Sequence, residues 1–199
     1  MADRFRLIAI TPEVTEADEQ RRVELLIDSG FDFVHIRKSY ADERALRTYL
    51  ESISEPYRAQ LTLHDRHDLA REYGIGGIHL NRRNSTPPEG YCGRLSRSLH
   101  SIDELTEADD GNDYCTLSPI YDSISKAGYR SNFSADALRQ ALTDRRIKVP
   151  VIALGGVTPE KLGELQQLGF AGAAFLGYLF ADVDIDVLKQ RIRTIKQHL

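Results

Sequence analysis

Short apolar runs alternate with longer amphipathic segments along this chain, and the alternation repeats about eight times. The short runs are nearly continuous in hydrophobic residues, which is typical of strands buried on both faces of a parallel sheet. We therefore predict eight strands, at residues 5–10, 33–36, 61–63, 77–80, 94–98, 114–117, 150–154 and 172–176.

The segments between most of these runs have the pattern of amphipathic helices. Val23, Leu26 and Ile27, for example, recur at helical spacing among charged neighbours. Two helix starts are marked by Ser101, which has an acid three residues later, and by Thr158, which precedes a proline. The predicted helices are 16–29, 42–54, 66–73, 101–108, 134–142, 159–168 and 184–198.

Eight strands that alternate with about seven helices indicate a parallel α/β fold. A (β/α)₈ TIM barrel holds eight strands, whereas an open doubly wound sheet usually has five or six. We predict one TIM-barrel domain over residues 1–199. The stretch 82–93, rich in proline and glycine, should replace or distort the helix after the fourth strand.

Composition narrows the function classes. The 199 residues are 41% hydrophobic and carry a net charge of −4. The hydrophobic fraction is too high for a disordered chain, and a weakly acidic chain gives no reason to expect nucleic acid or a membrane as partner. The N-terminus lacks the apolar core of a signal peptide, which predicts a cytoplasmic location. Two cysteines make neither a disulfide framework nor a zinc motif.

Candidate chemistry gathers where the predicted strands end, which is where the active sites of parallel barrels lie. Four of the six histidines fall at this rim, together with several cations that would suit a phosphate or pyrophosphate group. The rim residues are His35, Arg37, Lys38, His64, Asp65, Arg66, His79, Arg82, Arg83, Ser98, His100, Tyr121, Ser123, Ser125 and Lys126.

Glycines end the last two strands. Gly155 and Gly156 lead into a helix start, and Gly177 follows the eighth strand. Free amides at these turns can bind a phosphate, as the loops after strands 7 and 8 do in many barrels; the alternative is that the glycines only make tight turns.

Aspartate and histidine side chains bear on whether this rim binds a metal ion. Asp65 is either a magnesium ligand or a salt-bridge partner, since one carboxylate holds Mg²⁺ only if substrate phosphates complete the shell. The histidine spacing matches no transition-metal motif. We expect His79 to be a hydrogen-bonded core residue and His67 to lie on the surface of a helix.

Together the strand-end motifs resemble the thiamine phosphate synthase family and the related thiazole tautomerases, over nearly the whole chain. Six motifs in the right order carry the resemblance: His35-Ile36-Arg37-Lys38-Ser39, His64-Asp65-Arg66-His67-Asp68-Leu69-Ala70, Gly77-Ile78-His79-Leu80-Asn81, Ser98-Leu99-His100, Ser118-Pro119-Ile120-Tyr121-Asp122-Ser123-Ile124-Ser125-Lys126 and Leu154-Gly155-Gly156-Val157.

The resemblance implies a transferase of thiamine biosynthesis that joins an aminopyrimidine (hydroxymethylpyrimidine) diphosphate to thiazole phosphate and releases pyrophosphate. It implies small phosphorylated substrates and a Mg²⁺ cofactor. A homo-oligomer is compatible with the sequence, which does not determine the oligomeric state. Arg37, Lys126 and Ser98 would hold the diphosphate, and Asp65 would bind Mg²⁺. Ser123 and Ser125 would line the thiazole side, with the phosphate on the amides of Gly156 and Gly177.

The sequence departs from the synthase pattern at four positions. A glutamine becomes His35, a lysine becomes Ser39, an asparagine becomes His64, and the second metal-binding aspartate becomes Asn84, beside two arginines that could neutralise phosphate instead. These changes leave two alternatives. One is an isomerase of thiazole phosphate, with His35, His64 or His100 as general acid or base, although Pro119 stands where tautomerases have a histidine. The other is a non-catalytic binder of phosphorylated thiazole.

Overall fold

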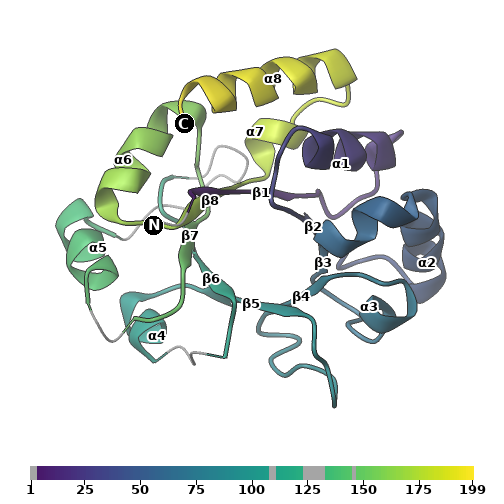
Figure 1. Ribbon diagram of the computed structural model, residues 1–199, viewed down its shortest axis with the longest axis horizontal. Coiled ribbons are helices and arrows are strands. Elements are labelled where there is room, and N and C mark those ends of the chain that lie inside the picture. Colours follow the sequence, from purple (N-terminus) through teal and green to yellow (C-terminus); the bar gives the residue numbers. More distant parts are fainter. Residues whose placement is uncertain (1–3, 108–110, 123–132, 145–146) are drawn as a thin grey trace.

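The eight predicted strands close into a parallel barrel in the computed structural model, which describes residues 4–107, 111–122, 133–144 and 147–199 (Figure 1). Each strand pairs with its neighbours in the sequence, and β1 pairs with β8 to close the ring. The strands are β1 Arg6–Ile10, β2 Phe33–Ile36, β3 Leu61–Leu63, β4 Gly77–Leu80, β5 Arg94–Leu99, β6 Tyr114–Leu117, β7 Val151–Ala153 and β8 Gly172–Phe175. The predicted TIM barrel is thereby confirmed.

Helices surround the barrel as an outer layer (Figure 1). They are α1 Glu19–Asp28, α2 Glu43–Ser52, α3 Leu69–Glu72, α4 Ile102–Thr106, α5 Ala135–Leu142, α6 Leu162–Leu168, α7 Gly177–Phe180 and α8 Ile185–Gln197, with 3₁₀ helices η1 Glu55–Gln60 and η2 Pro159–Lys161. The outer layer has a gap between α3 and α4, where the chain after β4 runs to β5 without a helix (Figure 1). The irregular segment predicted there is confirmed.

Side-chain caps begin several helices where the sequence predicts them. The Ser101 hydroxyl accepts a hydrogen bond from the Glu104 amide at 3.1 Å, as expected for a capping box, and Ser134 caps α5 in the same way. At Thr158 the prediction is only half right. Pro159 does stand in the first turn, but that turn is 3₁₀ and the threonine side chain makes no cap bond.

The larger hydrophobic core lies between the strands and the helices. It combines alternate residues of the strands, such as Leu7 and Ala9 of β1, with helix residues such as Leu26, Leu50 and Leu165. Because successive strand side chains point to opposite faces, the remaining strand residues point into the barrel.

The barrel interior is divided lengthwise into an apolar and a polar half. Strands β6, β7, β8 and β1 supply a small hydrophobic cluster, whose buried members are Ile8, Ile10, Tyr114, Ile152 and Ala174. The inward positions of β2 to β5 carry polar side chains that are at most 1% exposed: His35, Thr62, His79 and Ser96. The polar half places hydrogen-bonding groups directly beneath the mouth where the strands end.

Within the described part of the chain, no helix is both long enough and apolar enough to cross a membrane.

Candidate active site

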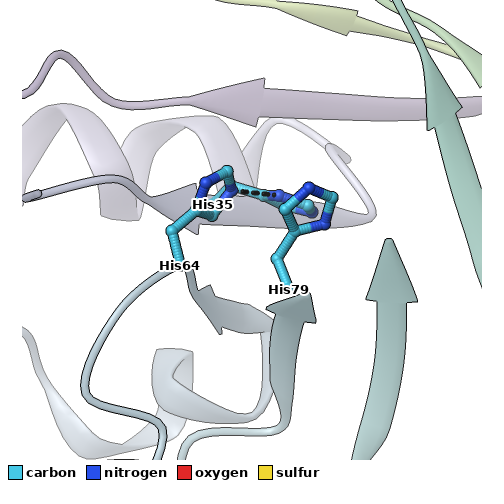
Figure 2. Close-up of side chains that lie close together, drawn as sticks. All are labelled: His35, His64 and His79. Carbon is cyan, nitrogen blue, oxygen red and sulfur yellow. Dashed lines mark hydrogen bonds between the residues drawn. The ribbon is translucent and has the colours of Figure 1, made fainter. Parts of the chain in front are cut away.

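Three histidines from three adjacent strands meet inside the polar half of the barrel (Figure 2). His35 is the third residue of β2, His64 follows the last residue of β3, and His79 is the third residue of β4. Their ring centroids are 4.3 to 5.0 Å apart. The sequence places each of them at the rim, and the structure brings them together as one cluster.

His35 connects two neighbours by hydrogen bonds. Its Nδ1 lies 2.8 Å from Nε2 of His64, as Figure 2 shows, and its Nε2 lies 2.6 Å from the hydroxyl of Tyr114 on β6. His35 is completely buried, whereas 8% of His64 is exposed. His64 is therefore the member of the cluster that a ligand in the mouth reaches first.

His79 is held by two serines of β5. Its Nδ1 lies 2.8 Å from the Ser96 hydroxyl and its Nε2 lies 2.7 Å from the Ser98 hydroxyl. Ser96 donates its own proton to the carbonyl of Ile78, so it accepts from Nδ1–H of His79. The Nε2 atom then carries no proton and accepts from Ser98. This confirms the expectation that His79 is a hydrogen-bonded core residue.

Burial keeps the three imidazoles neutral. It is the main cause that lowers the pKa of His35 and of His64 well below the usual value, and that lowers the pKa of His79 to about 3. The neighbouring histidines add to the effect, because one protonated ring disfavours the next. The cluster therefore presents neutral donors and acceptors to the mouth at neutral pH.

The cluster is arranged as a hydrogen-bond network rather than around an ion. One ring nitrogen from each histidine lies within 4.8 Å of the others, a spacing at which a metal is conceivable. However, the rings of His64 and His79 are stacked with their planes 25° apart, and both nitrogens of His35 and of His79 are hydrogen-bonded. An imidazole coordinates through the lone pair in its ring plane, and stacked rings do not aim two such lone pairs at one ion.

Asp65 forms a second polar group at the mouth. Its Oδ1 accepts from Nη2 of Arg83 at 3.1 Å, from Nε of Arg83 at 3.3 Å and from Nδ2 of Asn84 at 3.0 Å. Nη2 of Arg83 also lies 3.3 Å from Oδ2 and 2.9 Å from the Ser39 hydroxyl. Of the two roles expected for Asp65, the structure contains the salt bridge.

These donors differ from the ligands of Mg²⁺. The ion takes six oxygen ligands in octahedral geometry, most often carboxylates, waters and phosphates. Around Asp65 the contacting groups are a guanidinium and the NH₂ end of an amide. Asn84 does lie within reach of Asp65, but it adds a hydrogen-bond donor where a second carboxylate would add charge. The donor set does not fit a divalent cation.

The cations expected at the rim have different surroundings. Arg37 is paired with Glu13 at 2.8 Å, and Arg66 lies 3.5 Å from Glu43. The expectation that Lys38 belongs to the mouth is wrong. Its ammonium is buried 2.7 Å from the carboxylate of Glu19, the first residue of α1, and donates a hydrogen bond to the carbonyl of Pro12. Burial lowers the pKa of Lys38, and the Glu19 carboxylate opposes that shift.

The positions of two other histidines, His67 and His100, can also be compared with those expected from the sequence. His67 is buried, which corrects its expected surface position, because α3 begins only at Leu69 and the preceding turn packs inward. His100 is exposed at the rim, with Nδ1 3.1 Å from the carbonyl of Ser118.

The glycine turns lie at the ends of β7 and β8, as expected. Gly155 and Gly156 have φ of +92° and +64°, a backbone that L side chains rarely adopt, and Gly177 begins α7. A Cβ on Gly156 would lie 2.4 Å from the carbonyl oxygen of Asp122. Ser123, Ser125 and Lys126 lie outside the described residues.

Sequence reasoning placed Arg83 at the rim but missed its pairing with Asp65, and it missed the histidine network. A signal for part of the network was present: each of the three histidines lies near the C-terminal end of one of three consecutive strands, and these ends lie side by side in a parallel barrel. The strand register itself pairs His35 with Thr62 and not with His64. The partners in other elements, such as Tyr114 and Ser96, have no signal in local spacing.

Comparison with known proteins gives consistent matches. A family model described as thiamine monophosphate synthase matches residues 7–179. A thiamine-phosphate synthase of Thermus thermophilus is 28% identical over 185 residues, which cover 89% of this chain and 87% of that protein. One of Lactococcus lactis subsp. cremoris is 26% identical, covering 87% of this chain and 84% of that protein.

Solved structures are similar over almost the whole chain. The crystal structure of thiamine phosphate pyrophosphorylase from Bacteroides thetaiotaomicron superposes with a TM-score of 0.86 at 30% identity, covering 98% of this chain and 97% of that one. A thiamine phosphate pyrophosphorylase from Pyrococcus furiosus has a TM-score of 0.76 at 19% identity and covers 99% and 96%. The second match is a likeness of fold.

Proposed function

The chain belongs to the thiamine monophosphate synthase family, and from this membership we propose that it joins hydroxymethylpyrimidine diphosphate to thiazole phosphate, forming thiamine phosphate and pyrophosphate. The observation that carries the proposal is the family match over residues 7–179, a range that contains the C-terminal ends of all eight strands. In a parallel barrel those ends form the active site.

Departure of the diphosphate is the first step of the proposed reaction. The C–O bond between the pyrimidine methylene and the diphosphate breaks, and its electron pair stays on the diphosphate oxygen. The negative charge that develops there is stabilised by Arg37 and Arg83, and Lys126 is proposed to contribute. Cations that are already in position account for most of the rate acceleration in such reactions, because they stabilise the negative charge where it develops.

The pyrimidine is proposed to lie above the histidine cluster. A neutral aminopyrimidine needs neutral donors and acceptors, and His64 supplies them from the exposed side of the network. His35 and Tyr114 hold His64 in place through the 2.8 Å and 2.6 Å hydrogen bonds. Ser98 lies at the C-terminal end of β5, and its single hydroxyl proton goes to His79. It is proposed to exchange that hydrogen bond for one to the diphosphate when the ligand binds.

The thiazole phosphate is proposed to bind across the mouth, at the turns after β7 and β8. The left-handed backbone of Gly155 and Gly156 and the start of α7 at Gly177 present main-chain amides without a side chain in the way. Ser123 and Ser125 are proposed to line this side. The lone pair of the thiazole nitrogen then attacks the pyrimidine methylene cation and forms the C–N bond.

The test is incubation of the purified chain with both substrates, in Mg²⁺ and in EDTA, with thiamine phosphate measured as fluorescent thiochrome. We expect product only when both substrates are present. Absence of product in both buffers contradicts the proposal. Turnover of thiazole phosphate alone would identify the isomerase, and saturable binding of thiazole phosphate without turnover would identify the binder.

A variant pair sharpens this test. Arg37→Ala should lower kcat/KM by about 10- to 100-fold, equal to about 1.4 to 2.7 kcal/mol, because it removes a cation from the leaving group. Arg44→Ala on the exposed side of α2 removes the same charge and should leave kcat/KM unchanged. The cytoplasmic location and the homo-oligomer stay predictions, whereas the donors around Asp65 do not support the Mg²⁺ site expected there.

A further inference from the structure

We propose that the guanidinium of Arg83 takes the place of a divalent cation beside Asp65, so that this chain binds a diphosphate at its mouth without a metal ion there. The inference rests on the proposed function for the identity of the natural ligand. It concerns a different property, which is how the charge of that ligand is neutralised.

The first observation is that N–H donors surround the Oδ1 atom of Asp65. Arg83 approaches the carboxylate through Nε and Nη2, with three N···O distances of 3.1 to 3.3 Å. The Asn84 amide adds a further donor at 3.0 Å. A cation bound to these oxygens would have to displace an arginine that already neutralises them.

The second observation fixes the orientation of the Asn84 amide. Its Nδ2 lies 3.0 Å from Oδ1 of Asp65 and 3.2 Å from the carbonyl of His64. Both neighbours are acceptors, so only the NH₂ end of the amide satisfies them, and the amide oxygen is turned away from Asp65. Asn84 is therefore not available as a cation ligand on the Asp65 side.

The third observation is that the backbone holds Arg83 in position. Oδ1 of Asn81 accepts from the amides of Arg83 at 2.9 Å and of Asn84 at 3.1 Å. Asn81 and Asn84 also exchange two main-chain hydrogen bonds, at 3.0 and 3.1 Å. This closed turn after β4 carries the arginine toward Asp65 and Ser39.

The guanidinium keeps donors for an anion. The contacts to Asp65 and Ser39 use Nε and Nη2, and Nη1 carries two more protons. The Arg83 side chain is 58% exposed, against 18% for Asp65. The two Nη1 protons are the donors left for phosphate oxygens, and Nη2 can join them in a paired contact if it gives up the Ser39 hydroxyl. Arg83 thus bridges the carboxylate and an incoming diphosphate, as a divalent ion would.

Binding of inorganic pyrophosphate in EDTA, measured by calorimetry, tests the inference without relying on catalysis. The wild-type chain should bind it, and Arg83→Ala should weaken the affinity about tenfold or more, equal to about 1.4 kcal/mol. Arg82→Ala is the matched control, because it removes the same charge one residue away, at an exposed side chain for which the described residues provide no ion pair. The control should change the affinity less than about twofold.

A direct measurement of cation binding completes the design. Mn²⁺ added to the free chain and followed by electron paramagnetic resonance should show no site that depends on Asp65. The double variant Arg83→Ala, Asn84→Asp, which removes the guanidinium and adds a carboxylate, should gain one. Thermal melts of each variant establish that it is folded.

Three results would overturn the inference: no pyrophosphate binding in EDTA, equal effects of Arg82→Ala and Arg83→Ala, or a wild-type Mn²⁺ site that Asp65→Ala removes. These results are independent of product formation. If thiamine phosphate fails to form in either buffer while Arg83 still controls pyrophosphate affinity, the proposed function is wrong and the role of Arg83 stands.

Discussion

At the scale of single residues, burial determines the chemistry of the histidines. His35 and His79 lie on the inner surface of the barrel and are at most 1% exposed. Among the described residues their hydrogen-bond partners are neutral, so protonation would bury a charge without a carboxylate to pair with it. The hydrogen bonds to Tyr114, Ser96 and Ser98 satisfy the neutral rings. The same rings would be costly to charge.

This arrangement makes stability depend on pH in a defined direction. In the unfolded chain a histidine takes up a proton near pH 6.5, whereas folded His79 does so only near pH 3. Below about pH 6.5 the unfolded state therefore binds more protons, and the free energy of unfolding falls as pH falls, by up to about 1.4 kcal/mol per pH unit for each such histidine. Above that pH these groups add no dependence.

Urea unfolding across a pH series from about 5 to about 8 measures the effect. His79→Asn should reduce the slope of the free energy of unfolding against pH below about 6.5. The wild-type chain, carried through the same pH series, gives the reference slope. An unchanged slope in His79→Asn would contradict the assignment of this histidine as neutral and buried.

The element scale shows how loops and helices are attached to the barrel. Lys38, in the loop after β2, forms a buried ion pair with Glu19 of α1, and the Tyr49 hydroxyl of α2 donates to the same carboxylate at 2.6 Å. One carboxylate thus connects three elements. Burial raises the pKa of Tyr49 well above its usual value, so the phenol stays a donor.

Removal of Lys38 alone from its ion pair with Glu19 should strongly destabilise the folded protein. Lys38→Met leaves the Glu19 carboxylate buried without its cation, and we expect a loss of about 3–5 kcal/mol in the free energy of unfolding. The double variant Lys38→Met, Glu19→Leu removes both charges and should recover part of that loss. Urea denaturation of the three proteins checks this, and a double variant less stable than the single one would show that the pair acts differently.

The turn after β7 gives a second prediction at this scale. Gly156→Ala places a methyl group 2.4 Å from the Asp122 carbonyl oxygen and forces φ of +64° on an L residue. The variant should lose about 2 kcal/mol or more of stability and weaken the affinity for thiazole phosphate.

Gly163 provides the matched control for that change. It lies in α6, and a Cβ there meets nothing within 4 Å. Gly163→Ala should therefore stabilise the protein by about 0.5–1 kcal/mol, because alanine favours the helix. Thermal unfolding and calorimetry with thiazole phosphate compare the two variants, and equal stability would contradict the steric argument for Gly156.

The bounds of strands and helices could be predicted from the sequence far better than the contacts between side chains. The strands at 33–36, 61–63, 77–80 and 114–117 have the predicted bounds, because continuous apolar runs mark strands buried on both faces. Helix α3 is shorter than predicted, and η1 and α7 were missed, because short turns have weak periodicity. Lys38 was misplaced because nothing in a sequence shows toward which element a loop cation turns.

At the scale of the whole molecule, the net charge of −4 does not show how charged side chains are distributed around the mouth of the barrel. Sequence alone suggests a strongly cationic rim, but Arg37 and Arg83 are each paired with a carboxylate, and Lys38 is buried. We expect the paired arginines to bind phosphate at short range, through direct hydrogen bonds. Their long-range field is smaller than a count of cations implies.

Ionic strength tests this picture. Exposed charges are screened over about 10 Å at 0.1 M salt, so salt weakens long-range attraction much more than close hydrogen-bonded contacts. We expect the affinity for pyrophosphate to fall only about two- to fivefold between about 0.05 and about 0.3 M salt. Glu13→Gln, which frees Arg37, should raise the affinity at low salt and steepen the dependence on salt. A steep dependence in the wild-type chain would contradict the pairing.

The lengthwise division of the barrel interior has a consequence for evolution. Residues that close the barrel by packing, such as Ile8 and Ile152, lie on different strands from the polar residues of the histidine cluster, such as His35 and His64. Mutations on β2 to β5 can therefore accumulate under selection for a new ligand while the packing of β6, β7, β8 and β1 is conserved. A lineage with this architecture can change its chemistry in small steps without passing through an unfolded ancestor.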